Sequence, residues 1–313
     1  MSESFFAAVH VVVPMVLLIA LGWFTRVRGM ITRSAMKEFD KILFKIFMPT
    51  LLFKNIYDMD FSQGFAVKEM IFSGVCLLII FIFCVKLPKF LTPDGNKSSV
   101  IGQAVVRGNY ILFGVAVSEA LYGEGNIGAV VMLSIVVIPA INIFAAIILE
   151  INRTGKAKFA KLFMAVLKNP MIIGAILAFI FKFFHIIIPA PVWSVVKSIA
   201  NSTTTLSFIS LGIGLNMAEV KDDKNLLLWG IFLRMFVVPF IFMPLSILFG
   251  FRDQSLCAML VVFAAPTAVS SYPMAVAMGA DGQLAGQLVC ATTILSILTI
   301  FFWTLGLKTF GLM

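Results

Sequence analysis

Long, mostly apolar segments recur along the whole chain, and they constrain its fold more than any other feature. Ala66 to Val85 and Leu226 to Phe249 are two examples, each with about the 20 residues that a helix needs to cross the hydrocarbon of a bilayer. Of the 313 residues, 61% are hydrophobic and only 12% charged, whereas soluble domains have roughly 45–50% and about 25%. The sequence therefore predicts an all-α integral membrane protein with lipid as its solvent.

Ten such segments fit the chain. The first has no basic segment before it and no small-residue cleavage site after it, so we interpret it as a spanning helix rather than a signal peptide. The seventh is the least regular, because Asn201, Ser202 and three threonines make its centre polar. The expected spans are 5–25, 39–57, 66–86, 98–122, 126–149, 163–183, 190–215, 226–249, 254–278 and 284–307.

Basic residues are concentrated in alternate loops, which predicts the topology. By the positive-inside rule these loops face the cytoplasm, and an even number of helices then places both termini outside a multi-pass protein of the cell (plasma or inner) membrane. The net charge of +9 is explained by these loops and not by nucleic-acid binding, which would need a basic face with interleaved aromatic residues. The basic loops carry Arg26, Arg28, Arg33 and Lys37, then Lys86, Lys89 and Lys97, then Arg153, Lys156, Lys158 and Lys161.

The two halves of the chain match each other at an offset of 156 or 157 residues (170 minus 14, 281 minus 124). Correspondences at one offset indicate a duplication. Each repeat holds five helices, an odd number, so the second is expected to be inverted, as in many secondary transporters. The expected units are residues 1–150, a cytoplasmic linker at 151–168, and residues 169–313. The matches are Pro14-Met15 with Pro170-Met171, Lys41 with Lys197, and Glu124-Gly-Asn-Ile-Gly128 with Asp281-Gly-Gln-Leu-Ala285.

Residues that break helices occur at matched positions in the fourth and ninth spans. The fourth contains Arg107-Gly108-Asn109-Tyr110, and the ninth contains Ala264-Ala265-Pro266-Thr267 followed by Ser270-Ser271. Proline removes a backbone donor and glycine tolerates unwinding. In inverted-repeat carriers the substrate lies near the midplane, where discontinuous helices leave backbone groups free. The alternative is that these residues make ordinary kinks or close-packing contacts.

These breaks are among the segments in which the chain resembles the auxin efflux carrier family, which includes the plant PIN-type carriers and bacterial malate and malonate permeases. The most specific segment is Asn169-Pro-Met-Ile-Ile-Gly174, which follows a short basic linker. The resemblance covers nearly the whole chain. The other segments that carry it are Met48 to Phe53, Arg107 to Tyr110 with Gly114, Ser210 to Leu215, and Ala265 to Ala268.

The resemblance implies a ten-helix carrier of an organic anion, whose fourth and ninth helices unwind and cross at the centre beside a panel domain that moves little. The chain departs from the family at two places. Thr203-Thr204-Thr205 stands where the family tends to place a proline matching Pro49, and the long cytoplasmic loop of many plant members is replaced by Ile151 to Leu167. The short loop indicates the compact bacterial type.

The candidate substrate-binding residues lie at the two breaks. A cation near mid-membrane costs at least ~2.5 kcal/mol, and the guanidinium of Arg107 suits a carboxylate; its alternatives are capping the carbonyls freed by the break or pairing with Glu119. Asn109 can donate and accept. Amides at the start of a half-helix favour an anion, although nearby hydroxyls can instead bond to their own helix. The full set is Arg107, Gly108, Asn109, Tyr110, Pro266, Thr267, Ser270 and Ser271.

Other polar residues within or near the spans are left out of this site. His10 and His185 are isolated near the membrane boundaries, and Lys45 and Arg234 can extend to the interface or pair internally. The four cysteines lie in apolar segments without a CxxC pair, as expected of small apolar fillers.

The expected function is secondary transport, by alternating access, of a small organic anion: a mono- or dicarboxylate such as malate or malonate, or an auxin-like acid. A receptor or channel for a small solute is the first alternative. A membrane-embedded enzyme is the second. Such an enzyme would need a cluster of acids, a set of metal ligands or an activated nucleophile, and the sequence offers none of these. No catalytic residue, metal or cofactor is expected, and the absence of a GxxxxGK[ST] motif argues against direct ATP drive. The expected partners are the anion and the lipid bilayer, with no nucleic acid; a homodimer is left open.

Overall fold

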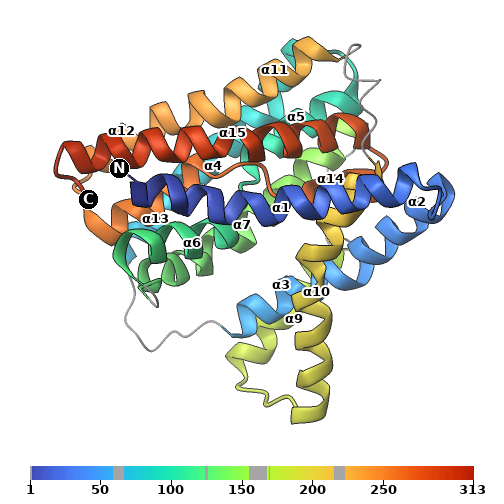
Figure 1. Cartoon of the computed structure of the whole chain (residues 1–313). Coiled ribbons are helices and arrows are strands. Elements are labelled where there is room, and N and C mark those ends of the chain that lie inside the picture. Colours follow the sequence, from blue (N-terminus) through green and yellow to red (C-terminus); the bar gives the residue numbers. More distant parts are fainter. Residues whose placement is uncertain (1, 59–66, 124–125, 155–167, 169, 215–222) are drawn as a thin grey trace.

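The computed structural model describes residues 2–58, 67–123, 126–154, 168, 170–214 and 223–313. Within these ranges the regular elements are all helical (Figure 1). Most of the expected linker 151–168 and the first part of the expected span 163–183 lie outside the described residues. The elements of the first half are α1 (Ser2–Val27), α2 (Arg33–Ile42), η1 (Leu43–Phe47), α3 (Met48–Tyr57), α4 (Val67–Leu91), α5 (Gly95–Val106), α6 (Tyr110–Tyr122) and α7 (Gly128–Thr154).

The second half of the chain also consists of helices of unequal length. Its elements are α9 (Pro170–Phe183), α10 (Ala190–Gly214), α11 (Lys224–Phe232), η3 (Leu233–Val237), α12 (Val238–Leu248), α13 (Asp253–Ala264), α14 (Ser271–Ala277) and α15 (Gly282–Thr309). The structure thus divides the expected span 98–122 into α5 and α6, and the expected span 254–278 into α13 and α14. The α10 helix is continuous through Thr203, Thr204 and Thr205.

The outer surface is apolar, as the composition predicts. Among the described residues, four segments are long and apolar enough to cross a membrane: Val67–Leu91, Gly128–Ile151, Lys224–Leu248 and Gly282–Thr309. Large side chains such as Phe90, Ile187 and Leu248 are 80% or more exposed, which water would not tolerate over a wide area but lipid solvates readily. The structure is therefore that of an all-helical integral membrane protein.

The helices pack in two groups, which we call the crossing group and the support group. In the crossing group α4, α5 and α7 pack on one another, α13 packs on α6 and α12, η3 packs on α12, and α14 packs on α15, which we count with this group. In the support group α10 packs on α1, α2 and α3, and α3 packs on α9. Figure 1 shows α3, α9 and the start of α10 projecting to one side, away from α12 and α15. The two groups touch where α1 meets α6 and α15, and where α14 meets α2 and α10.

Two helices contain a π-helical turn, and both turns lie just before a proline. Pro49 follows η1 and Pro239 follows η3. Proline has no N–H to donate to the preceding turn, so a wider turn takes up the mismatch. Each of the two turns also carries a cation: Lys45 in η1 is exposed, whereas Arg234 in η3 is 1% exposed.

Glycines bring the support-group helices into backbone contact. A Cβ at Gly212 of α10 would lie 2.0 Å from the carbonyl oxygen of Ile19, and one at Gly22 of α1 would lie 2.1 Å from that of Ile209. Gly174, the last residue of the segment most specific to the family, packs in the same way on the backbone of Pro49. Small residues at helix interfaces are the usual means of close packing in membranes.

We expect Gly212→Ala to destabilise the protein, because the clashing atoms are backbone and the two helices must separate. Overpacking of this kind costs about 1–3 kcal/mol. The matched control is Gly306→Ala in α15, where an added Cβ would meet no described atom within 4 Å and helix propensity should improve stability by roughly 0.5–1 kcal/mol. Melting temperatures of the detergent-purified proteins measure both. Equal stability of the two variants would contradict the packing.

Candidate functional site at the helix crossing

The two helix breaks are joined to each other by backbone hydrogen bonds. The amide of Asn109 donates to the carbonyl of Pro266 at 2.8 Å, and the amide of Ala268 donates to the carbonyl of Arg107 at 2.9 Å. Gly108 and Thr267 therefore face each other as a single antiparallel bridge. These two bonds satisfy part of the backbone groups that unwinding frees in both helices, which away from water need partners within the protein.

Arg234 holds the carboxyl ends of both half-helices at this crossing. Its Nε donates to the carbonyl of Ala265 at 2.8 Å, its Nη1 to that of Val105 at 2.9 Å, and its Nη2 to that of Val262 at 3.4 Å. The last carbonyls of α5 and α13 have no partner within their own helices and carry the negative ends of the helix dipoles. A buried cation that bonds to both ends thus neutralises both.

Gly108 has to be glycine because Arg234 occupies the space beside it. A Cβ at Gly108 would lie 2.1 Å from Nη2 of Arg234, and the bonds to three carbonyls prevent the guanidinium from moving aside. Gly108, which the sequence marks as a helix breaker, therefore also leaves room for Arg234, the residue that stabilises the break.

A cavity of about 170 Å³ lies beside the crossing, and we call it the crossing cavity. Both helix groups line it. Its polar lining residues are Asn55 of α3, Arg107, Asn109 and Tyr110 at the first break, Asn142 of α7, Thr203, Thr204 and Ser207 of α10, and Ser270 at the second break.

Two side chains of this lining keep a buried donor without a partner among the described residues. Arg107 is 3% exposed, and its Nη2 donates to Oδ1 of Asn142 at 2.7 Å, which leaves Nη1 unpaired. Asn142 is fixed in turn by its Nδ2, which donates to the carbonyl of Ile138. The second unpaired donor is Nδ2 of Asn109. Because an unsatisfied buried donor costs about 1–3 kcal/mol, two of them beside one cavity suit a ligand that accepts hydrogen bonds.

The start of α6 adds backbone donors to the same cavity. Tyr110, Ile111 and Leu112 line it, and the N–H groups of a first helical turn have no partner within the helix. The N-cap residue Asn109 makes no side-chain cap to them. A helix N-terminus carries the positive end of the dipole and favours an anion. One cation, two unpaired side-chain donors and a helix start therefore surround one small cavity.

The structure brings together five of the eight residues proposed from the sequence. Arg107, Gly108, Asn109, Tyr110 and Ser270 line the crossing cavity, and the Tyr110 hydroxyl is anchored by donating to the carbonyl of Val130 at 2.9 Å.

The other three lie at the crossing but are not among the lining residues. The carbonyl of Pro266 accepts from Asn109, and the hydroxyl of Thr267 donates to the carbonyl of Ala104 at 3.0 Å. The Ser271 hydroxyl is buried without a partner among the described residues. These three residues remain candidates for binding, with positions that suit holding the break.

Several residues of the site were not proposed from the sequence. Asn142 is an isolated amide in an apolar segment three residues after Pro139, and Thr203, Thr204 and Ser207 belong to the polar centre of the seventh span. For Arg234 the sequence leaves open an extension to the interface or an internal pairing, and the structure shows the pairing, with the carbonyls of Val105, Val262 and Ala265. Its only sequence signal is a cation in an apolar segment shortly before Pro239.

The apolar outer surface, the broken helices and the polar centre define a class of protein: a helical membrane protein with interrupted helices around a polar cavity. A family model described as membrane transport protein matches residues 7–304, and the chain belongs to this family, that of the auxin efflux carriers. An uncharacterized transporter of Methanocaldococcus jannaschii is 24% identical over 308 residues, which cover 94% of this chain and 96% of the relative. The resemblance inferred from the motifs is thereby confirmed.

We expect Arg234→Lys to lower the melting temperature although it keeps the positive charge. A single ammonium cannot hold the carbonyls of Val105, Val262 and Ala265 in the geometry of the guanidinium fork, and each buried acceptor left unpaired costs about 1–3 kcal/mol. Lys45→Ala is the control, since it removes the exposed cation of the other π-helical turn and should change stability by less than about 0.5 kcal/mol. An Arg234→Lys protein as stable as the wild type would show that the crossing does not depend on the bonds from Arg234 to the three carbonyls.

Proposed function

We propose that this transporter carries a small organic anion by alternating access, with the crossing cavity as its binding site. The observation that supports this most directly is the pair of unpaired buried donors, Nη1 of Arg107 and Nδ2 of Asn109, beside the free amides of α6. A carboxylate accepts hydrogen bonds from all three kinds of donor, and charge-assisted bonds are the strongest available. The substrates proposed are mono- or dicarboxylates such as malate or malonate, or an auxin-like acid.

The different hydrogen-bond partners of the two buried arginines support a binding role for Arg107. Sequence alone left open whether Arg107 caps the carbonyls freed by the break. In the structure Arg234 makes those bonds, and Arg107 bonds to Asn142 while retaining a free Nη1 beside the cavity. Arg107 is therefore the cation available to a ligand.

The proposed architecture consists of ten spanning helices in two inverted five-helix repeats, residues 1–150 and 169–313. Its support is that the breaks α5/α6 and α13/α14 are matched in the sequence, with Asn109 and Pro266 separated by 157 residues (266 minus 109), and that these breaks bond to each other. The loops with basic residues would face the cytoplasm and both termini the outside.

Topology reporters test this architecture. A reporter fused after residue 155 should be cytoplasmic and one fused after Met313 external, because an odd number of helices separates the two positions in the proposed plan. Alkylation of single introduced cysteines by a membrane-impermeant reagent gives an independent measurement. Both positions on one side of the membrane would contradict the inverted ten-helix plan.

Substitutions at the cavity test the binding site. Asn109→Ala removes one donor and leaves the break intact, so a lost hydrogen bond of ~0.5–1.5 kcal/mol should weaken affinity roughly two- to tenfold. Arg107→Ala should abolish uptake while folded protein still reaches the membrane. Binding is measured by the thermal shift that malonate, malate or a monocarboxylate produces in purified protein, and transport by uptake into proteoliposomes.

Asn96→Ala is the matched control, because Asn96 is exposed at the start of α5. Unchanged affinity and rate in well-folded Asn109→Ala protein would place the site elsewhere. Saturable, slow uptake separates a carrier from a channel, and thermal shift without uptake would indicate a receptor.

A further inference from the structure

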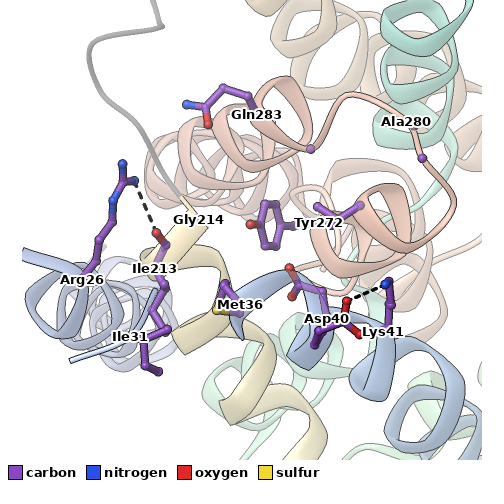
Figure 2. A pocket seen from close by; sticks show the side chains of 14 residues that line it. Arg26, Ile31, Met36, Asp40, Lys41, Ile213, Gly214, Tyr272, Ala280 and Gln283 are labelled. Carbon is purple, nitrogen blue, oxygen red and sulfur yellow. Dashed lines mark hydrogen bonds and ion pairs between the residues drawn. The ribbon is translucent and has the colours of Figure 1, made fainter. Parts of the chain in front are cut away.

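A second, larger cavity lies along the same helices as the crossing cavity. Its volume is about 550 Å³, and we call it the end cavity (Figure 2). α10 contributes Ile213 and Gly214 to the end cavity, and Ser207 one to two turns earlier to the crossing cavity. α14 likewise contributes Tyr272 to the end cavity, while Ser270 before its first turn lines the crossing cavity. In the proposed topology the end cavity lies on the cytoplasmic side.

A buried carboxylate lines the end cavity. Asp40 of α2 is 1% exposed and accepts a hydrogen bond from the hydroxyl of Ser210 on α10. Within the described part of the chain no lysine or arginine makes an ion pair with it. A carboxylate that leaves water without a counter-ion pays a large desolvation penalty, and in spanning helices such groups characteristically belong to ion or proton pathways.

The charged residues that line the end cavity beside Asp40, among those that the structure describes, are engaged elsewhere. On α2 itself, Lys41 bonds to Glu38 at 2.6 Å, so this pair is neutral as a unit. Arg26 of α1 donates to the carbonyl of Ile213 at 3.4 Å, and Figure 2 shows its guanidinium on the far side of Ile213 from Asp40. The groups beside Asp40 from the remaining elements are the phenol of Tyr272 on α14, which lines the same cavity, and the hydroxyl of Ser210 on α10, while Lys45 on η1 is exposed.

We propose that Asp40 is a proton-binding site that couples transport to the pH gradient. The proton passes between water in the end cavity and a carboxylate oxygen of Asp40, which becomes a neutral carboxylic acid when it binds and a carboxylate again when it leaves. Ser210 serves both states, because a hydroxyl can donate to a carboxylate and accept from a carboxylic acid. The coupling part of this inference rests on the proposed function; the proton binding does not.

The position of Asp40 explains how its charge could affect the cycle. Its hydrogen bond joins α2 to α10, and α10 also lines the crossing cavity through Thr203, Thr204 and Ser207. Neutralising Asp40 removes the desolvation penalty at this joint and changes a charge-assisted bond to a neutral one, which is weaker. A hard metal cation fits the site less well, since it needs several more oxygen ligands than the carboxylate of Asp40 and the hydroxyl of Ser210 provide.

The first test detects the proton directly and does not depend on any substrate. Infrared difference spectra of the purified full chain are recorded during a pH titration, and the carbonyl-stretch band of a protonated carboxylic acid should appear as the pH falls. All 15 Asp and Glu side chains can contribute to this band, so Asp40→Asn, which preserves the shape and the bond to Ser210, should lose only the component that Asp40 adds. Glu38→Gln, which removes an exposed carboxylate of the same cavity, should retain the Asp40 component. A band of full intensity in Asp40→Asn protein would overturn the proposal.

The second test measures coupling in proteoliposomes with malonate as the probe. In wild-type protein an imposed pH gradient should drive accumulation above the level reached by malonate exchange alone. In Asp40→Asn protein the ratio of gradient-driven accumulation to exchange should fall to the value found without a gradient. Undiminished accumulation in that variant, or accumulation that follows a sodium gradient instead, would overturn the coupling. If wild-type protein exchanges no malonate, the proposed function fails for this anion, and the infrared titration still decides whether Asp40 binds a proton.

Discussion

The bonds from Arg234 to the ends of two broken helices are the interaction on which the centre of this protein depends. Unwinding a helix inside a bilayer frees carbonyls and amides that no water can satisfy. The guanidinium of Arg234 reaches carbonyls at the ends of both α5 and α13, and the extended segments bond to each other at Gly108 and Thr267. Without these bonds, two unwound segments at mid-membrane would be too costly to keep.

The same arrangement bears on the charge of the ligand that we propose for the crossing cavity. The carboxyl ends of α5 and α13 are satisfied by a cation of the protein, whereas the amino end of α6 has no side-chain cap and borders the crossing cavity. The carbonyls at the ends of α5 and α13 are thus neutralised by Arg234, whereas the first amides of α6 and the Nη1 of Arg107 stay available to the proposed ligand. The break is asymmetric in its hydrogen bonding, and this asymmetry favours an anion over a cation.

The sequence predicted the membrane setting, both breaks and the position of Arg107 and Asn109 at one of them, because apolar length, proline and glycine act locally. It could not assign the two buried arginines, since Arg234 meets its partners 129 and 31 residues away in the chain and nothing near it in sequence indicates this. Thr267 shows the same limit: its hydroxyl, a candidate ligand by position, bonds to Ala104 of α5. Asn142 can accept the bond from Arg107 only because α7 packs beside the break, and the sequence does not show that packing.

The distribution of these bonds bears on how such a protein could move. Arg234, Arg107, Asn142 and Thr267 bond within the crossing group, whereas Asp40 with Ser210 and Thr203 with the carbonyl of Phe47 bond within the support group. The crossing cavity nevertheless has walls from both groups. A displacement of one group against the other would therefore change the cavity's access while breaking none of the hydrogen bonds named here, and those bonds are the expensive ones in lipid. The charge at Asp40 would then act at the contact between α2 and α10, beside Tyr272 of α14, and influence the crossing cavity through the residues of α10 that line it.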